Sequence, residues 1–354
     1  MQSFDPAVVS GKQAVVVGAA YSEGVLSAST PHEPVRWGFM AAGWIATDAL
    51  APAVHCADGA VLQAVASRDP SRARRLSPVG DVHATYGALL ADPAVEAVYI
   101  SLTNEVHCRW SIAALEAGKH VLCEKPLAMN ADEVRRMIDA AALADRLLVE
   151  ATWSRWHPRT RRAEALLATG RIGRVQRIEA AFGFDGVDPG NYRHDPALGG
   201  GALYDVGPYA VGAALWAVPD VPVEVVSVER RDNPQGADLV MRSILHVGDA
   251  VADTVCAIGE EVGEWVRIHG DAGTLELDGL AHTSQQEPST LTISGTDEDA
   301  VLHFAPVDPY QVMVEHVSRA IRGDRSAWVL PLDQSLRAAE TLDAIFAASR
   351  SPEG

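Results

Sequence analysis

The sequence has few of the residues on which several protein classes depend. Only four cysteines occur in 354 residues, and 29 basic side chains stand against 47 acidic ones. No two cysteines have C-x-x-C spacing, so nothing indicates a disulfide framework, and we expect buried thiols in a reducing compartment. The net charge of -18 repels nucleic acid and anionic membranes, so neither is an expected partner. The cysteines are Cys56, Cys108, Cys123 and Cys256.

An apolar run long enough to cross a bilayer is also absent from the sequence. Residues 14–21, "AVVVGAAY", resemble a short signal-peptide core, and "SAS" follows at 27–29. However, Asp5 precedes this run and Lys12 alone supplies positive charge, which is not typical of a signal peptide. We therefore expect a cytoplasmic protein with an unusual leader.

The length and the order of apolar segments predict two domains after an N-terminal extension at 1–33, which ends in the turn-rich "TPHEP". Over 34–152, apolar strands alternate with amphipathic helices, which is typical of a parallel sheet covered on both faces, the α/β Rossmann arrangement. The expected strands are 35–40, 60–67, 94–101, 120–124 and 147–152.

A different pattern begins in the second predicted domain, 153–354. One helix is expected at 158–170, followed by seven strand-like runs with little helix between them, and by terminal helices at 310–322 and 333–349. Because consecutive strands usually pair antiparallel or in mixed sheets, we expect an α+β domain with a large open, mainly antiparallel sheet.

The stretch "GFMAAGWIA", 38–46, nearly matches the dinucleotide-binding pattern G-x-G-x-x-G/A. Ala41 occupies the first glycine position, and Gly43 occupies the second, where backbone approaches the pyrophosphate. Trp44 and Ile45 open the helix whose N-terminus would hold the phosphates. Ala41 fits if its backbone angles are ordinary; a left-handed conformation would cost about 1 kcal/mol. A rival loop around Gly18 lacks a following helix.

The end of the second strand indicates which nicotinamide cofactor is bound. An acidic residue there would hold the ribose hydroxyl of NAD, but Ser67 and Arg68 are suited to the 2′-phosphate of NADP. Asp69 precedes Pro70 and is expected to cap the next helix. We therefore expect NADP(H), with NAD(H) as the alternative.

Two longer motifs carry a family resemblance. "AGKHVLCEKPLAMNADEV" (117–134) and "GGGALYDVGPY" (199–209), with "RIGRV" and "GDAGTLEL", resemble the Gfo/Idh/MocA oxidoreductases. "RWGFM", "LCEKP" and "VEATWSRWHP" are most similar to its dihydrodiol and D-xylose dehydrogenase branch, which tends to lack the first fingerprint glycine. The resemblance implies an NAD(P)-dependent enzyme acting on sugars or cyclic polyols. It also implies a C-terminal sheet that lines the substrate site and joins subunits into a dimer or tetramer.

The resemblance also implies catalytic residues. Glu124 and Lys125 match the family's E-K-P motif, and Asp205 and Tyr209 match its D-x-x-x-H or D-x-x-x-Y pair. The chemistry is consistent, since hydride transfer at a carbinol carbon needs a group that moves the hydroxyl proton. On a helix, Asp205 and Tyr209 would face one side. We expect the Lys125 ammonium to lower the pKa of Tyr209 from its ordinary value near ~10.

Further candidates follow strand ends, where ligands of doubly wound folds bind. Those expected near the cofactor are Thr103, Asn104 and His107. Those expected near the substrate are Trp153, Arg155, His157 and Arg193, although core packing would explain the aromatic residues equally well. The twelve histidines form no metal-like pattern, so no metal is expected.

The sequence therefore predicts an NADP-preferring dehydrogenase or ketoreductase acting on CH–OH groups of a sugar, sugar derivative or cyclic diol. One alternative is a 3-keto sugar-nucleotide reductase, whose substrate diphosphate would need Arg155, Arg159 or Arg193. An alternative of another class is a non-catalytic cofactor-sensing regulator, which the intact Lys125, Asp205 and Tyr209 argue against.

Overall fold

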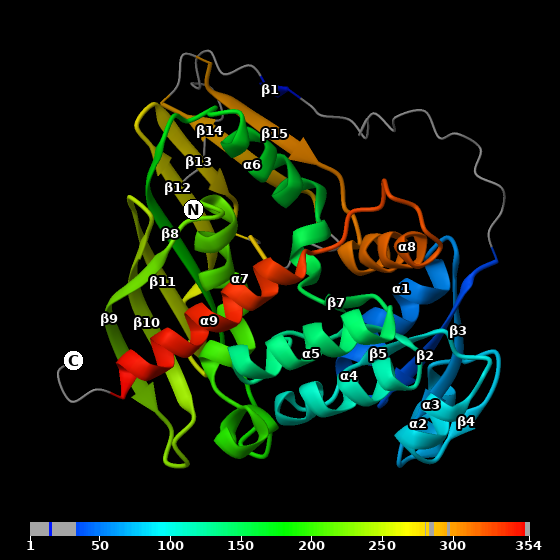
Figure 1. Cartoon of the computed structure of the whole chain (residues 1–354). Helices are drawn as coiled ribbons and strands as arrows, with labels where there is room; N and C mark the ends of the chain where they lie inside the picture. Colours follow the sequence, from blue (N-terminus) through cyan, green and yellow to red (C-terminus); the bar gives the residue numbers. More distant parts are fainter. Residues whose placement is uncertain (1–13, 16–32, 280, 283–286, 296–297, 351–354) are drawn as a thin grey trace, which may run out of the picture.

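The computed structural model describes residues 14–15, 33–279, 281–282, 287–295 and 298–350, which form two β-sheets with helices packed on both (Figure 1). The first sheet has six parallel strands in the order β4-β3-β2-β5-β6-β7. Its strands are β2 (Val35–Met40), β3 (Ala60–Ala66), β4 (Val82–His83), β5 (Ala97–Ile100), β6 (His120–Cys123) and β7 (Leu148–Glu150).

Helices alternate with these strands, which confirms the doubly wound Rossmann sheet. Strand β2 is covered on both faces, because Trp37 and Phe39 on one face and Met40 on the other are all buried. This burial explains the continuous apolar run from which the sequence predicted a strand of a parallel sheet. The helical segments are η1 (Ala46–Leu50), α1 (Ala51–Cys56), α2 (Pro70–Arg75), α3 (Tyr86–Ala91), η2 (Asn104–Val106), α4 (His107–Glu116) and α5 (Ala131–Ala144).

The second sheet has nine strands in the order β1-β15-β14-β13-β12-β8-β11-β10-β9. Only the β8–β11 and β1–β15 pairs are parallel, which confirms the predicted mainly antiparallel sheet. Its strands are β1 (Ala14–Val15), β8 (Val175–Phe184), β9 (Val223–Asp232), β10 (Asp238–Val247), β11 (Ala250–Ile258), β12 (Gly263–Gly270), β13 (Gly273–Leu277), β14 (Ser289–Ser294) and β15 (Ala300–Phe304).

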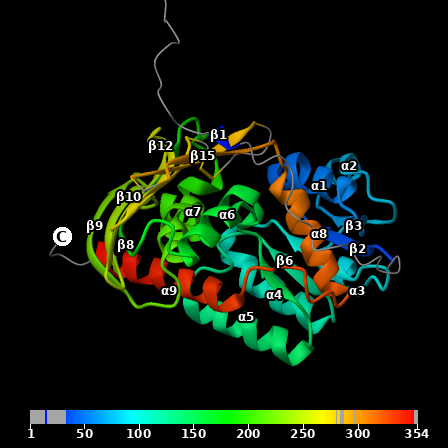
Figure 2. The same cartoon turned by 90° about the horizontal axis from the view of Figure 1, so that it is seen from above.

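Helix α7 (Ala202–Ala217) packs on strands β8, β10 and β11, and Figure 2 shows it lying inside the curve of the sheet. Almost every residue of α7 is buried, so this helix forms the centre of the second core. The remaining helical segments of this part are η3 (Trp153–Trp156), α6 (Pro158–Ala168), η4 (Tyr192–His194) and η5 (Pro196–Leu198).

The last two helices connect the sheets. Helix α8 (Pro309–Ile321) packs on α1 and β3, and the Trp37 indole donates to Ser318 Oγ at 3.1 Å. Helix α9 (Leu332–Ser349) lies against α5, α7 and β9 (Figures 1 and 2). The chain thus returns to the first sheet near its end, and the domain division at residues 152 and 153 stays a prediction.

The structure bears on two expectations from the sequence, the burial of the cysteines and the lack of a membrane-spanning segment. Three cysteines are buried, but Cys56 is exposed at the end of α1, which corrects the prediction that all four are buried. Among the described residues, no helix is both long enough and apolar enough to span a membrane. The extension at 1–33 lies outside the described residues except for the two residues of β1 and Glu33.

Candidate active site

The fingerprint loop connects β2 to a helix, as predicted, but its first position is strained. Ala41 has φ = 83°, in the left-handed region that favours glycine, so the expectation of ordinary angles is wrong. The Ala41 amide donates to the carbonyl of Ala66 on β3 at 2.9 Å, which attaches this residue to the end of the parallel sheet.

The backbone of the loop is open to a ligand at Gly43. A Cβ atom built on Gly43 would meet no atom within 4 Å, so open space lies above its backbone. Trp44 follows with 71% of its surface exposed and begins the helical run. The run widens to a π-helix at η1, since Pro52 has no N–H to donate four residues back. These features fit a pyrophosphate at a helix N-terminus.

The residues that follow β3 are arranged around its tip. The Ser67 amide donates to the His83 carbonyl on β4 at 3.1 Å, while Ser67 Oγ accepts from the Asp69 amide at 3.1 Å. Asp69 caps α2 by accepting from the Ser71 amide at 2.9 Å, as predicted. Arg68 is exposed beside them, which leaves its guanidinium accessible to a ligand phosphate.

The two family motifs meet at one acidic side chain. Lys125 lies on the loop after β6, and its Nζ donates to the Asp205 carbonyl at 2.6 Å and to Asp205 Oδ1 at 3.2 Å. Arg193 Nε donates to Asp205 Oδ2 at 2.6 Å. Asp205 therefore bridges two cations in the first turn of α7. Burial alone would raise the pKa of Asp205, but these cations hold it below its ordinary value.

Tyr209 lies one helical turn after Asp205, so both face one side of α7 as predicted. Lys125 Nζ lies 5.2 Å from the centroid of its ring, and the Trp153 ring is 5.8 Å away. Burial, reinforced by Glu124 and Asp205, raises the pKa of Tyr209 well above its ordinary value. This corrects the expectation that Lys125 lowers it, because desolvation of the phenolate outweighs the nearby cation.

The loop that carries Lys125 is held by buried polar groups. Glu124 accepts a hydrogen bond from the Tyr99 hydroxyl at 2.7 Å, and burial raises its pKa. The ring nitrogens of His107 lie 2.9 Å from the Pro126 carbonyl and 3.0 Å from the Leu102 carbonyl. His107 is thus a support of this loop.

The other predicted cofactor residues lie on η2 and the turn before it. Asn104 is buried and donates to the Gly199 carbonyl at 2.8 Å, which connects the Rossmann sheet to the glycine run before α7. Thr103 Oγ1 donates to the Glu105 carboxylate at 2.8 Å. Asn104 therefore connects the Rossmann part to the segment before α7, while both partners of His107 lie within the Rossmann part.

The predicted substrate residues after β7 separate in space. Trp153 contacts Tyr209 and stacks on Tyr310 with ring centroids 4.8 Å apart. Arg155 instead pairs with Glu164 at 2.7 Å, and His157 caps α6 by accepting from the Arg159 amide at 3.1 Å. The Trp153 ring contacts the Tyr209 ring, whereas Arg155 reaches Glu164 on α6 and Gln334 on α9 and lines one cavity together with Tyr209.

Sequence reasoning missed two residues beside Tyr209. His282 stacks on Phe182 at 5.4 Å, and both rings lie within 5.8 Å of the Tyr209 ring. Burial lowers the pKa of His282 to about 3, so this histidine stays neutral. His282 and Tyr209 also line a cavity of about 60 Å³. The alternation of strand β8 could have indicated an inward Phe182, but no pattern marks His282.

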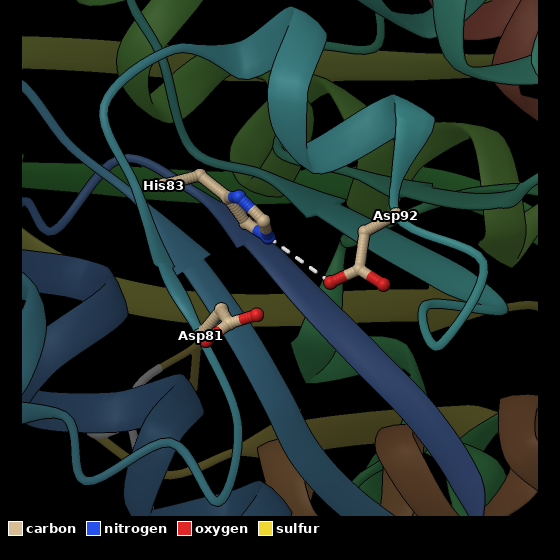
Figure 3. Close-up of side chains that lie close together, drawn as sticks. All are labelled: Asp81, His83 and Asp92. Atoms are coloured by element: carbon tan, nitrogen blue, oxygen red, sulfur yellow. Dashed lines mark hydrogen bonds and ion pairs between the residues drawn. The ribbon is translucent and has the colours of Figure 1, made fainter.

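A group of potential metal ligands lies elsewhere, at the outer edge of the first sheet. Donor atoms of Asp81, His83 and Asp92 all lie within 4.8 Å of one another (Figure 3). His83 Nε2 and Asp92 Oδ2 are 3.0 Å apart, and Asp92 Oδ1 accepts from the Ala94 amide. The contact between His83 and Asp92 and the position of His83 on β4 bring the three side chains together, and we assign no metal to them.

Comparison with known proteins places this geometry in context. Two protein-family models match the chain. The family model described as "Oxidoreductase family, NAD-binding Rossmann fold" matches residues 35–152, and the family model of the GFO/IDH/MocA C-terminal domain matches residues 160–276. The chain is 34% identical to the uncharacterized oxidoreductase ORF334 of Rhizobium meliloti, over 88% of this chain and 96% of that protein.

Two relatives carry named activities. The chain is 32% identical to D-xylose 1-dehydrogenase (NADP(+)) 2 of Haloferax volcanii, over 90% of this chain and 98% of that protein. It is 30% identical to trans-1,2-dihydrobenzene-1,2-diol dehydrogenase of Homo sapiens, over 88% of this chain and 96% of that protein.

Among solved structures, the 3-ketoreductase KijD10 of Actinomadura kijaniata, in complex with NADP and TDP-benzene, is similar with a TM-score of 0.80 and 26% identity. It covers 89% of this chain and 98% of its own.

Proposed function

The chain belongs to the GFO/IDH/MocA family of oxidoreductases, and on this premise we propose an NADP-preferring dehydrogenase or ketoreductase of uncharged sugars, sugar derivatives or cyclic diols. The observation that carries this proposal is the cluster of Lys125, Asp205 and Tyr209, which joins the Rossmann loop after β6 to helix α7. Those residue types can bind and protonate a carbinol or carbonyl oxygen.

The cofactor-binding residues are assigned by their places in the fold. Bound NADPH would supply the hydride from its reduced nicotinamide ring. The space above Gly43 and the exposed Arg68 support the phosphate positions. The proposed set is Ala41, Gly43, Trp44, Ile45, Ser67, Arg68, Thr103, Asn104, His107, Glu124 and Lys125.

Tyr209 is the proposed proton donor. A phenol with a raised pKa is neutral at physiological pH, so it suits donation to the oxygen of a ketone during reduction. Lys125 then stabilises the developing negative charge on that oxygen, and Asp205 fixes the lysine. In oxidation the roles reverse, and the Tyr209 phenolate that reduction leaves behind accepts the hydroxyl proton, so this direction requires Tyr209 to have lost its own proton first.

The charges near the cluster favour an uncharged substrate. The three arginines that could hold a diphosphate are each paired with a carboxylate, Arg193 with Asp205, Arg155 with Glu164 and Arg159 with Asp278. Pairing reduces the gain from binding an anion, because the anion must compete with a carboxylate already in place. A neutral sugar or diol needs no such exchange. The proposed substrate contacts are Lys125, Trp153, Arg155, His157, Arg193, Asp205 and Tyr209.

A 3-keto sugar-nucleotide reductase is the second candidate, favoured by the similarity to KijD10. Two structures of KijD10 carry single substitutions, of a tyrosine and of a lysine. The interval between those two positions equals the interval between Lys125 and Tyr209 here. The paired arginines argue against it for this chain. The intact cluster argues against a non-catalytic regulator.

The proposals for the two domains and for the oligomer rest on the same family membership. Residues 34–152 would hold the cofactor, and residues 153–354 would bind substrate and join subunits into a dimer or tetramer through the large sheet. Four free cysteines support a cytoplasmic location. Light scattering of the purified chain would give the subunit number.

A substrate panel tests the proposal. NADPH and NADH oxidation would be followed with neutral keto sugars, sugar acids and a nucleotide-linked keto sugar, and NADP⁺ reduction with neutral sugars and cyclic diols. We expect turnover of neutral compounds with NADPH. Turnover of the nucleotide sugar alone would favour the second candidate. Cofactor binding without turnover of any compound would favour the regulator. Lys125→Met is the control, and we expect it to bind NADPH but lose turnover at least tenfold.

A further inference from the structure

Helix α7 begins without a capping side chain of its own. Its N-cap residue is Gly201, with φ = 122° and ψ = 154°, a conformation open to glycine. A Cβ atom at Gly201 would lie 2.1 Å from Asp238 Oδ1. The Leu203 amide instead donates to Asp238 Oδ2 at 2.7 Å. A carboxylate from the first residue of β10 therefore caps the helix that carries the catalytic cluster.

The turn between β9 and β10, which precedes Asp238, also contacts the segment before α7. Asn233 follows β9, and its Nδ2 donates to the His194 carbonyl at 2.9 Å. Its Oδ1 accepts from the amides of Gln235 and Ala237 at 3.0 and 2.9 Å, which fixes the turn itself. Both side chains are at least nine-tenths buried, Asn233 at 9% exposure and Asp238 at 1%.

These two contacts flank the pair of residues that bind each other in the cluster. His194 directly follows Arg193, and Leu203 comes two residues before Asp205. The β9–β10 turn thus holds one segment on each side of the Arg193–Asp205 ion pair. Resting on the proposed function, we propose that Asp238, with Asn233, is a positioning residue that sets Asp205 between Lys125 and Arg193.

The charge of Asp238 is part of this role. A carboxylate at a helix N-terminus is stabilised by the free amides and the helix dipole, and it accepts a stronger hydrogen bond than a neutral carboxyl group does. The groups that face it are Arg230 and Asp232 on β9, Tyr204 on α7 and Cys256 on β11. Burial raises the pKa of Asp238 to about 6. The carboxylate is therefore charged above pH 6, and its cap weakens as the pH falls below 6.

The first test compares Asp238→Ala with Asp238→Asn, which keeps an acceptor for the Leu203 amide. We expect Asp238→Ala to lower kcat/KM at least tenfold while the Kd for NADPH stays within twofold of wild type. Asp238→Asn keeps an acceptor but no charge, so it should restore part of this loss, and its activity should decline less than that of wild type between pH 7 and pH 5. Asn233→Ala should give a smaller loss of the same kind.

Thr85→Ala is the matched control, since it removes the cap of α3, whose Ala88 amide donates to Thr85 Oγ1. It should leave kcat/KM unchanged. A loss in Asp238→Ala no larger than in Thr85→Ala, or an Asn variant no better than the Ala variant, would overturn the proposal.

A second readout does not depend on turnover. The carboxyl carbon of Asp205 can be titrated by NMR, with Asp205→Asn for assignment. The pKa of Asp205 is held low by its two cations, so we expect it to rise in Asp238→Ala and to stay unchanged in Thr85→Ala. An unchanged Asp205 titration in Asp238→Ala would contradict the proposal. If wild type turns over no substrate, the proposed function fails while this titration still decides the positioning role.

Discussion

Lys125 and Asp205 are 80 residues apart in sequence, yet the Lys125 ammonium donates to both the main-chain carbonyl and the carboxylate of Asp205. One residue follows a strand of the parallel sheet, and the other lies in the helix that packs on the large sheet. The contact therefore joins the two layers at the point where hydride transfer is proposed. A substitution at either residue is expected to affect chemistry and the relation between the layers together.

The left-handed Ala41 predicts a stabilising substitution. Ala41→Gly removes the clash of Cβ at φ = 83°, and the gain is partly offset by the greater freedom of glycine in the unfolded chain. We expect the free energy of unfolding to rise by about 0.5–1 kcal/mol in chemical denaturation. The neighbouring Ala42→Gly, at a buried position without positive φ, should destabilise. Equal destabilisation by both variants would contradict the strain at Ala41.

Cofactor choice depends on Arg68. Arg68→Ala removes a charge-assisted contact to the 2′-phosphate, so NADPH binding should weaken by roughly 1.5–3 kcal/mol, with NADH binding almost unchanged. Titration calorimetry with both cofactors measures this. Arg75→Ala, another exposed arginine at the end of α2, should change neither affinity. Equal losses for both cofactors in Arg68→Ala would remove the basis for preferring NADP.

The N-terminal extension is expected to be dispensable for cofactor binding. The chain is anchored where the Rossmann part begins, because the Arg322 guanidinium donates to the carbonyls of Glu33 and Pro34. A truncation that begins at Glu33 should bind NADPH as the full chain does. A tenfold weaker affinity, equivalent to ~1.4 kcal/mol, would show that the extension belongs to the site.

Acid should destabilise the first sheet through His120. Its Nδ1 accepts a hydrogen bond from the Leu147 amide at 3.0 Å, and burial lowers its pKa to about 4. The unfolded chain, with an ordinary pKa near 6.5, binds the proton more readily, so stability falls as the pH drops from 6.5 to 4. Because the ring is partly exposed, solvent screens its charge, and we expect this residue to contribute only about 1–2 kcal/mol of that loss.

His120→Asn should flatten this dependence in denaturant titrations at several pH values. The exposed His246, on β10, is the matched position, and His246→Asn should keep the wild-type slope. A wild-type slope in His120→Asn would mean that other groups cause the acid sensitivity.

The sequence predicted the features that depend on local pattern. Strand Val35–Met40 was placed to the residue, because a strand buried on both faces is continuously apolar. Asp69 before Pro70 predicted the cap of α2. The family motifs placed Lys125 and Asp205 in one site, and the structure brings their side chains together.

Features that depend on packing were beyond the sequence. The pKa of Tyr209 was expected to fall, because the sequence names a nearby cation but not the rings that bury the phenol. The sequence also does not give the partners of Arg155, which are Glu164 on α6 and Gln334 on α9, so its role at the substrate stays a prediction. The return of α8 to the first sheet, through Trp37 and Ser318, joins residues far apart in sequence.

The central claim is that Tyr209 transfers the proton, and the steady-state rate of Tyr209→Phe tests it most directly. The substitution removes one oxygen and keeps the ring packed against Phe182 and Trp153, so folding and NADPH binding should survive. With the best neutral substrate of the panel and saturating NADPH, we predict a kcat lower by roughly 10²–10⁴-fold, the usual contribution of general acid–base catalysis. A kcat within a few fold of wild type would contradict the account and leave Lys125 as the proton donor.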